Sequence, residues 1–215
     1  MSERARPTYL WMLAGILVLY TVIIGFGSTD AGGPARVAVL GFLVWNSTRL
    51  QNRPRVTRAA VVVAVAAVLA SALTAAFGTR SAVDAVVGAC SVLLITTAVW
   101  GIVARLIARF VVDASTVLGV LCIYLLFALF FADLHQFFAA FSTDYLTGTG
   151  NPPSPSDLLY YSVITLATVG FGDITPASEV ARAVTVVEAL VGQLYLVSVV
   201  AGVVGGWRGR PAARQ

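Results

Sequence analysis

Residues 168–173 read Thr-Val-Gly-Phe-Gly-Asp, and the backbone that this stretch requires decides which fold the rest of the chain must support. Gly170 and Gly172, one residue apart, can adopt φ > 0 at little steric cost, which residues with a Cβ rarely do. The residues between them can keep ordinary dihedral angles while their side chains point away. Successive carbonyl oxygens can then face one axis, and the Thr168 hydroxyl adds an oxygen at the inner end. Several copies around an axis would replace the hydration shell of a cation with rings of oxygen.

The segments on either side argue against an ordinary glycine-rich turn. A short apolar segment, residues 158–167, precedes the stretch, and a long apolar segment follows Ser178. A helix too short to cross a membrane, then a glycine loop, then a spanning helix is the order of a re-entrant pore loop. The sequence therefore predicts a re-entrant loop. We call residues 168–173 the filter loop.

Residues 154–157, Ser-Pro-Ser-Asp, predict where the short helix begins. Ser154 fits an N-cap, Pro155 the first helical position and Asp157 the third, which together make a capping box. The helix would run to about residue 167, and about 13 residues give only about 20 Å. Its C-terminal end, the negative pole of the helix dipole, would face the cavity below the filter loop and favour a cation there.

The composition indicates a membrane protein. Of the 215 residues 59% are hydrophobic and only 11% are charged, whereas charged residues make up about 25% of ordinary soluble domains. No intramembrane nucleophile or metal-ligand constellation suggests an enzyme; His135 is the one histidine, and Cys90 and Cys122 fit small core residues better than a disulfide. All 14 basic residues are arginine, a bias that indicates a GC-rich prokaryotic genome.

Six apolar segments are long enough to span a bilayer. The second is the weakest, since Arg36 opens it and polar residues 46–48 close it. The first has a long apolar core without a clear cleavage site, so we interpret it as a retained helix rather than a secretory signal. The six predicted spans are residues 9–27, 34–50, 59–77, 82–104, 115–139 and 179–206.

Arginine positions predict the orientation. With the N-terminus in the cytoplasm, 11 arginines lie inside and only Arg36, Arg80 and Arg182 lie outside, as the positive-inside rule requires. Both termini would then be cytoplasmic in a multi-pass plasma-membrane protein. This rule explains the arginines of residues 49–58 better than a nucleic-acid site does, and it leaves contact with anionic lipid open.

Residues 112–207 resemble the pore module of tetrameric potassium channels: outer helix, pore helix, filter and inner helix. Residues 160–173, Tyr-Tyr-Ser-Val-Ile-Thr-Leu-Ala-Thr-Val-Gly-Phe-Gly-Asp, match that family in length and register. The resemblance implies that Asp173 lies at the outer mouth and that Tyr160 and Tyr161 brace the filter; interfacial aromatic residues remain an alternative for both tyrosines. It also implies potassium sites at the carbonyls of Thr168, Val169, Gly170 and Phe171, within a filter that ends at Gly172.

Three residues depart from the common family pattern. Phe171 replaces a tyrosine and so lacks the hydroxyl that would tie the filter to its surroundings. Ile164 stands where some bacterial relatives carry a glutamate paired with the filter aspartate. Ala167 replaces a frequent threonine. We expect these departures to affect filter stability more than ion choice.

The last apolar segment is expected to line the pore. Gly192 lies 19 residues after Asp173, where the family has a hinge glycine; close helix packing is an equally open interpretation. From Gln193, four residues follow on one helical face, and we expect this face to line the cavity and an inner hydrophobic gate. These four are Leu196, Val197, Val200 and Val204.

Three ionisable residues occur within or beside apolar segments. Glu188 is five residues from Gln193, roughly 140° away at 100° per residue, so we expect it behind the filter, hydrogen-bonded to Ser162 or Thr165. A structural brace is our interpretation, with proton sensing as the alternative. For Asp133 and His135 we expect solvation at the interface, again with pH sensing as the alternative.

We therefore expect an all-α integral membrane protein with six transmembrane helices, a re-entrant pore helix and a filter loop, assembled as a homotetramer. Residues 1–111 form a four-helix membrane domain in the place of a voltage sensor but without its arginine spacing. Residues 112–207 form the pore domain, and residues 208–215 a short cytoplasmic tail.

The expected function is passive, potassium-selective conduction, with no enzymatic activity and no cofactor other than the permeant ion. The partners are potassium ions, membrane lipids and further copies of the chain, and no nucleic acid. The alternatives are a non-selective cation channel and a subunit of an ion-coupled potassium transporter.

Overall fold

A computed structural model describes residues 5–26, 32–49, 54–107 and 114–208. The described residues form helices and one two-stranded sheet, so the predicted all-α class is confirmed. In chain order the elements are α1 (Ala5–Phe26), α2 (Gly32–Arg49), α3 (Pro54–Phe77), α4 (Arg80–Ile107), α5 (Ala114–Ala139), β1 (Leu146–Thr147), α6 (Pro155–Leu166), β2 (Thr175–Pro176) and α7 (Glu179–Arg208).

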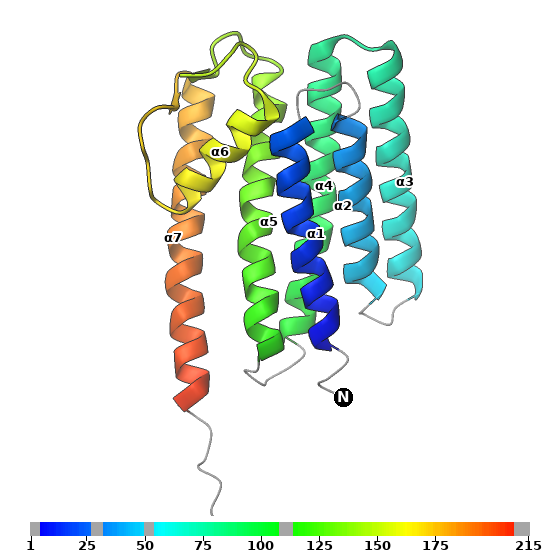
Figure 1. Ribbon diagram of the computed structural model, residues 1–215, viewed down its shortest axis with the longest axis vertical. Helices are drawn as coiled ribbons and strands as arrows, with labels where there is room; N and C mark the ends of the chain where they lie inside the picture. The colour runs from blue at the N-terminus through cyan, green and yellow to red at the C-terminus, as the bar shows by residue number, and fades with distance from the viewer. Residues whose placement is uncertain (1–4, 27–31, 50–53, 108–113, 209–215) are drawn as a thin grey trace, which may run out of the picture.

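The long helices run up and down side by side, and the short α6 crosses obliquely at one end (Figure 1). Helix α5 separates α7, at one edge, from α1 to α4. Helix α1 begins and α7 ends at the end of the bundle opposite α6 and the filter loop (Figure 1). The filter loop and the first and last helical residues therefore lie at opposite ends, as the predicted orientation requires.

A helix occupies each of the six predicted spans. Three described stretches are long and apolar enough to cross a membrane, namely Arg80–Ile107, Ser115–Ala139 and Glu179–Val199. The first three helices contain shorter described apolar stretches, Tyr9–Gly25, Ala35–Ser47 and Val61–Phe77. These apolar helices thus support membrane embedding.

The main core joins helices α1 to α4 to helix α5. Met12 of α1, Leu40 of α2, Leu94 of α4 and Leu126 of α5 are all buried in one apolar cluster. Helices α4 and α5 approach closely at Gly88, where a Cβ would lie 2.9 Å from the Asp133 carbonyl oxygen. This glycine lets two backbones pack together, as small residues do between membrane helices.

A buried polar cluster, which we call the Arg36 network, joins three helices near the end that carries α6. Arg36 of α2 contacts Asp133 of α5 at 3.1 Å and donates to Gln136 Oε1 at 2.6 Å. Gln136 in turn donates to Asp84 Oδ1 of α4 at 2.9 Å. The expected interfacial solvation of Asp133 is wrong, because α2 and α4 cover this face of α5 and leave the residue 1% exposed.

Replacing Arg36 with methionine is expected to lower the free energy of unfolding by about 3–5 kcal/mol, because the Asp133 carboxylate would stay buried without its ion-pair partner. Denaturant unfolding in detergent measures this loss. Arg80→Met is the matched control, since Arg80 is exposed, and a surface change of this kind shifts stability by about 0.5 kcal/mol or less. Equal stabilities of the two variants would show that the Arg36 network contributes nothing.

The loop between α5 and α6 is more ordered than its composition indicates. Residues 142–156 are rich in Gly, Pro, Ser and Thr, a composition that predicts a loop without structure of its own, and this prediction is wrong in part. Leu146 pairs with Pro176 and Thr147 with Thr175 in an antiparallel sheet, and Tyr145 and Leu146 are buried. Gly148 has φ +81, and a Cβ there would lie only 2.0 Å from the Asp173 carbonyl oxygen. The loop is therefore packed against the Asp173 end of the filter loop.

Candidate functional site

Helix α6 begins at the predicted capping box. The Ser154 side chain accepts from the Asp157 backbone N–H at 3.2 Å, and the Asp157 carboxylate accepts from the Ser154 backbone N–H at 3.2 Å. Pro155 is the first helical residue. The helix has 12 residues, about 18 Å at 1.5 Å per residue, well short of a hydrocarbon core of about 30 Å. Its length therefore suits a helix that enters the membrane without crossing it.

The filter loop has left-handed backbone at every second residue. Thr168, Gly170 and Gly172 have φ of 57°, 56° and 79°, whereas Val169 and Phe171 are outside the positive-φ region. In an extended strand successive carbonyls alternate sides, and reversing the hand at every second residue brings them to one side. Such a row of carbonyl oxygens can coordinate a dehydrated cation.

The positive φ of Thr168 was not predicted, since we assigned that conformation to the glycines alone. A β-branched residue is rarely left-handed, and strain of about 1–3 kcal/mol persists only where the surroundings impose the conformation. The surroundings here are hydrogen bonds to the end of α6. Thr168 N–H donates to Thr165 O at 3.0 Å, and Val169 N–H donates to Ile164 O at 2.8 Å.

These bonds also explain how the loop keeps its carbonyls available. Gly170 N–H donates to the same Ile164 carbonyl, at 3.4 Å, so the amides at the start of the loop are directed back toward α6. The carbonyls of the same residues are then left for a ligand. Val169 and Phe171 are exposed in the single chain, at 51% and 70%.

A hydrogen bond at the Asp173 end ties the filter loop to α6. The Tyr160 hydroxyl donates to Asp173 Oδ2 at 2.8 Å. This donation lowers the pKa of Asp173, and the same bond raises the pKa of Tyr160. Tyr160 thus supplies the coupling to the filter aspartate that Ile164 cannot make. Tyr161 points elsewhere, and its hydroxyl lies 2.7 Å from Thr185 Oγ1 of α7.

Replacing Tyr160 with phenylalanine is expected to raise the pKa of Asp173, because the donor that stabilises the carboxylate is lost. Because the pKa of Asp173 is depressed, the stabilisation from this bond is fully present above the ordinary pKa range of aspartate. It is lost as the pH falls through the lowered pKa. Carboxyl carbon NMR of selectively labelled protein measures the titration. Tyr161→Phe, which removes a hydroxyl bonded to Thr185 instead, should leave it unchanged; similar shifts in both variants would contradict the assignment.

Behind α6 lies a second buried polar cluster, the Glu188 network. Glu188 is 0% exposed, and its carboxylate accepts a hydrogen bond from Ser162, one of the two expected partners. His135 Nε2 lies 3.1 Å from the second carboxylate oxygen, and His135 Nδ1 lies 2.8 Å from the Tyr145 hydroxyl. The network therefore connects α7, α6, α5 and the loop before β1.

The position of His135 was not predicted. We expected solvation at the interface, but the ring is 0% exposed because α6, α7 and Tyr145 enclose it. The sequence held one signal for this pairing: an intramembrane carboxyl needs a polar partner, and His135 is the one histidine of the chain.

Gly192 marks the closest approach of α7 to the end of α6. A Cβ at this position would lie 2.5 Å from the Leu166 carbonyl oxygen, and the Tyr124 hydroxyl donates to that same oxygen at 3.3 Å. The structure thus gives the packing interpretation a specific contact. Helix α7 is continuous through Gly192, and a hinge there remains a proposal.

The structure describes the side chains of only part of the predicted cavity face. Gln193, Leu196 and Val197 are exposed in the single chain. The side chains of Val200 and Val204 lie outside the described residues. Helix α7 also exposes Val186, Leu190 and Leu194, so much of its described surface is exposed in the single chain. Among the described residues, no group of three or more His, Cys, Asp or Glu side chains could hold a metal ion.

Comparisons with known proteins find similarity to ion channels. Residues 119–205, which include α6, the filter loop and most of α5 and α7, match the family described as ion channel. A stretch of 68 residues is 32% identical to two pore potassium channel c of Oryza sativa subsp. japonica, covering 32% of this chain and 15% of that protein. No solved structure matches the chain significantly. The C-terminal region is thus similar to ion channels, including a potassium channel, and the matches point to a channel and not to an enzyme.

Proposed function

We propose that this protein is a potassium-selective channel in which four copies of the chain surround one pore. The observation that carries the proposal is the alternation of left-handed backbone at residues 168, 170 and 172, at the end of a helix too short to span. The carbonyl oxygens of Thr168, Val169, Gly170 and Phe171, with the Thr168 hydroxyl, would form the ion sites. Conduction is passive and needs no cofactor.

The homotetramer follows from one filter loop per chain, because a single loop cannot surround an ion. The faces that such an assembly would cover are exposed in the single chain, including Phe171 of the filter and Leu194 of α7. Four copies of the α6 C-terminus would direct their negative dipole ends at the central cavity. Asp173 would add negative charge at the mouth and concentrate cations there.

The proposed topology has six spans, cytoplasmic termini and the filter on the outer side of a plasma membrane. Its support is the 11-to-3 distribution of arginines and the position of α6 opposite the start of α1 and the end of α7 (Figure 1). Gly192 is proposed to let α7 pack against α6 and to serve as the site where the helix bends on gating. Gln193, Leu196, Val200 and Val204 are proposed to line the cavity and inner gate.

Two other transport functions compete with this proposal. A non-selective cation channel would not need the Thr-Val-Gly-Phe-Gly run, whose φ pattern suits closely spaced carbonyl rings. An ion-coupled transporter with several filters in one chain is disfavoured, because this sequence contains one such run.

Purified protein in liposomes tests the proposal. Potassium efflux driven by a gradient should occur, sodium efflux should be far slower, and the particle mass in detergent should equal four chains. Equal potassium and sodium fluxes would support the non-selective channel instead. A monomer or dimer that still conducts would exclude the tetramer.

Little voltage dependence is expected from helices α1 to α4. Moving one charge through the field is worth about 2.3 kcal/mol per 100 mV, and steep gating needs about three to four charges per subunit. Arg36 is held by Asp133 of α5, and the other arginines between Tyr9 and Trp100 fall at helix ends or in connections. Conductance measured against voltage should give a shallow curve. A steep curve abolished by substitutions in α1 to α4 would contradict this.

A further inference from the structure

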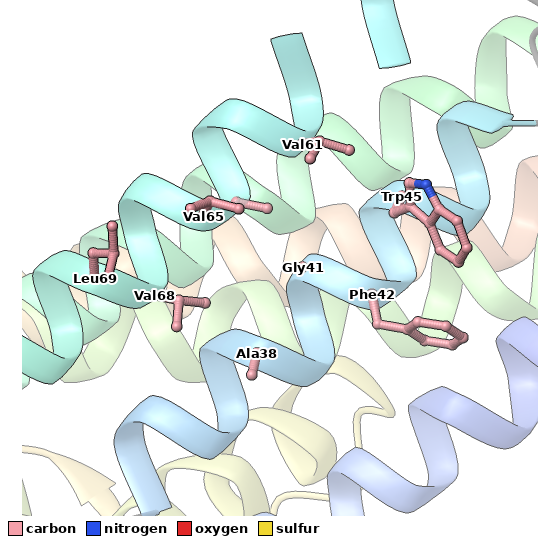
Figure 2. A pocket seen from close by; sticks show the side chains of 9 residues that line it. Ala38, Gly41, Phe42, Trp45, Val61, Val65, Val68 and Leu69 are labelled. Atoms are coloured by element: carbon pink, nitrogen blue, oxygen red, sulfur yellow. The ribbon is translucent and has the colours of Figure 1, made fainter. Parts of the chain in front are cut away.

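An apolar groove runs between α2 and α3 on the outer surface of the N-terminal helices. It has a volume of about 450 Å³ and is lined by residues of α2 between Ala38 and Trp45 and residues of α3 between Val61 and Leu69. Figure 2 shows Trp45 and Val61 toward one end of the groove and Ala38 and Leu69 toward the other. Its volume falls within the range of ligand sites in proteins.

The groove exists because small residues meet at its floor. A Cβ on Gly41 would lie 3.2 Å from the Ala64 Cβ, so the two helices touch there through their smallest side chains. The larger residues flank this contact: Phe42, Val65 and Leu69 are exposed at 53%, 52% and 63%. An apolar channel with an open side suits an extended hydrocarbon chain.

The groove faces away from the proposed pore. In Figure 1, α3 lies at the edge of the bundle opposite α7, with α5 between them. A fourfold axis beside α7 and the filter loop would turn α2 and α3 outward. Lipid, rather than a second copy of this chain, is then the neighbour of the groove.

Positively charged residues lie beyond one end of the groove, where they would favour an anionic lipid. Arg49 follows Trp45 by four residues in α2, and Arg58 precedes Val61 by three in α3, so each lies one helical turn beyond the groove on the same face. Arg58 is exposed. Between Ala35 and Phe77 the sequence contains no aspartate or glutamate, so these arginines have no acidic neighbour on their own helices.

We propose that this groove binds an anionic glycerophospholipid, with one acyl chain along α2 and α3 and the phosphate headgroup at Arg58. Arginine recognises phosphate by paired N–H donors, and basic residues beside a membrane surface attract anionic lipid. The site goes beyond the proposed channel function and does not depend on which ion permeates.

Trp45 is a built-in reporter for the site. In a variant that keeps this tryptophan alone, with Trp11, Trp100 and Trp207 changed to Phe, quenching by brominated acyl chains measures contact between lipid and groove. The full chain is reconstituted in bilayers that contain brominated phosphatidylglycerol or brominated phosphatidylcholine. We expect stronger quenching by the anionic lipid, and Arg58→Gln should weaken its relative affinity about fivefold. Arg80→Gln, at an exposed arginine outside the site, should not change it.

A matched pair of substitutions tests the groove itself. Val65→Phe places a ring in the groove and should reduce quenching, whereas Val62→Phe, at an exposed position of α3 outside the groove lining, should not. Equal quenching by the two lipids would overturn the proposal by showing general bilayer contact. Absence of quenching by either lipid would overturn it by showing that protein covers the groove. Both results leave the channel function to be tested separately by ion flux.

Discussion

Gly172→Ala is expected to abolish potassium selectivity, through the backbone and not through steric overlap. Gly172 has φ +79, and a Cβ there would meet nothing within 4 Å in the single chain. A left-handed alanine costs about 1–2 kcal/mol, and four copies around one pore multiply that cost. We expect the peptide to rotate and turn a ring of carbonyl oxygens away from the ion. Potassium and sodium flux from liposomes measures the loss.

Two comparisons separate this cause from others. Gly25→Ala is the matched control, since a Cβ at Gly25 also meets nothing within 4 Å and its φ is not positive; it should leave flux unchanged. A D-alanine at position 172, which favours φ > 0, should preserve selectivity better than L-alanine.

Gly170→Ala should act like Gly172→Ala because its φ is +56. Unchanged selectivity in both L-alanine variants would remove the filter assignment.

Glu188→Ala is expected to destabilise the protein by about 3–5 kcal/mol and so to reduce the amount of conducting protein. The substitution leaves His135 and Ser162 buried without their shared acceptor, and a buried network that loses one member is penalised heavily. Denaturant unfolding in detergent measures the loss. Glu179→Ala, at the exposed start of α7, is the control, with an expected change of about 1 kcal/mol or less.

Glu188→Gln distinguishes a hydrogen-bonding role from a charge role. The Ser162 hydroxyl has one proton and two neighbouring acceptors, the Ala128 carbonyl at 2.8 Å and Glu188. A glutamine can donate to Ser162 and accept from His135, so every group keeps a partner. We expect most of the stability and flux to be retained. If Gln is as damaging as Ala, a negative charge at Glu188 is required and the brace interpretation is wrong.

Local signals predicted the local features of this structure. The capping box at Ser154 needs only residues within one turn, and the same holds for the short α6 that it starts. The angular offset between Glu188 and the predicted cavity face gave two expected partners, Ser162 and Thr165, and the structure shows the bond to Ser162. These inferences succeed because helical geometry fixes directions over a few residues.

Features made by distant segments were not predictable from the sequence. Arg36 and Asp133 are 97 positions apart, and their burial depends on how α2 and α4 cover α5. Strands of two residues, such as β1 and β2, carry no detectable alternation. The left-handed Thr168 is imposed by the end of α6 and contradicts the preference of the residue itself.

The reversal potential of the purified protein in a planar bilayer tests the central claim most directly. With potassium on one side and sodium on the other, the account predicts a reversal potential far from zero, in the direction of the potassium equilibrium potential. Symmetrical potassium on the same membrane should then give reversal at zero. Reversal near zero under the potassium–sodium gradient, from protein that is tetrameric by mass, would contradict selective conduction through the loop of residues 168–173.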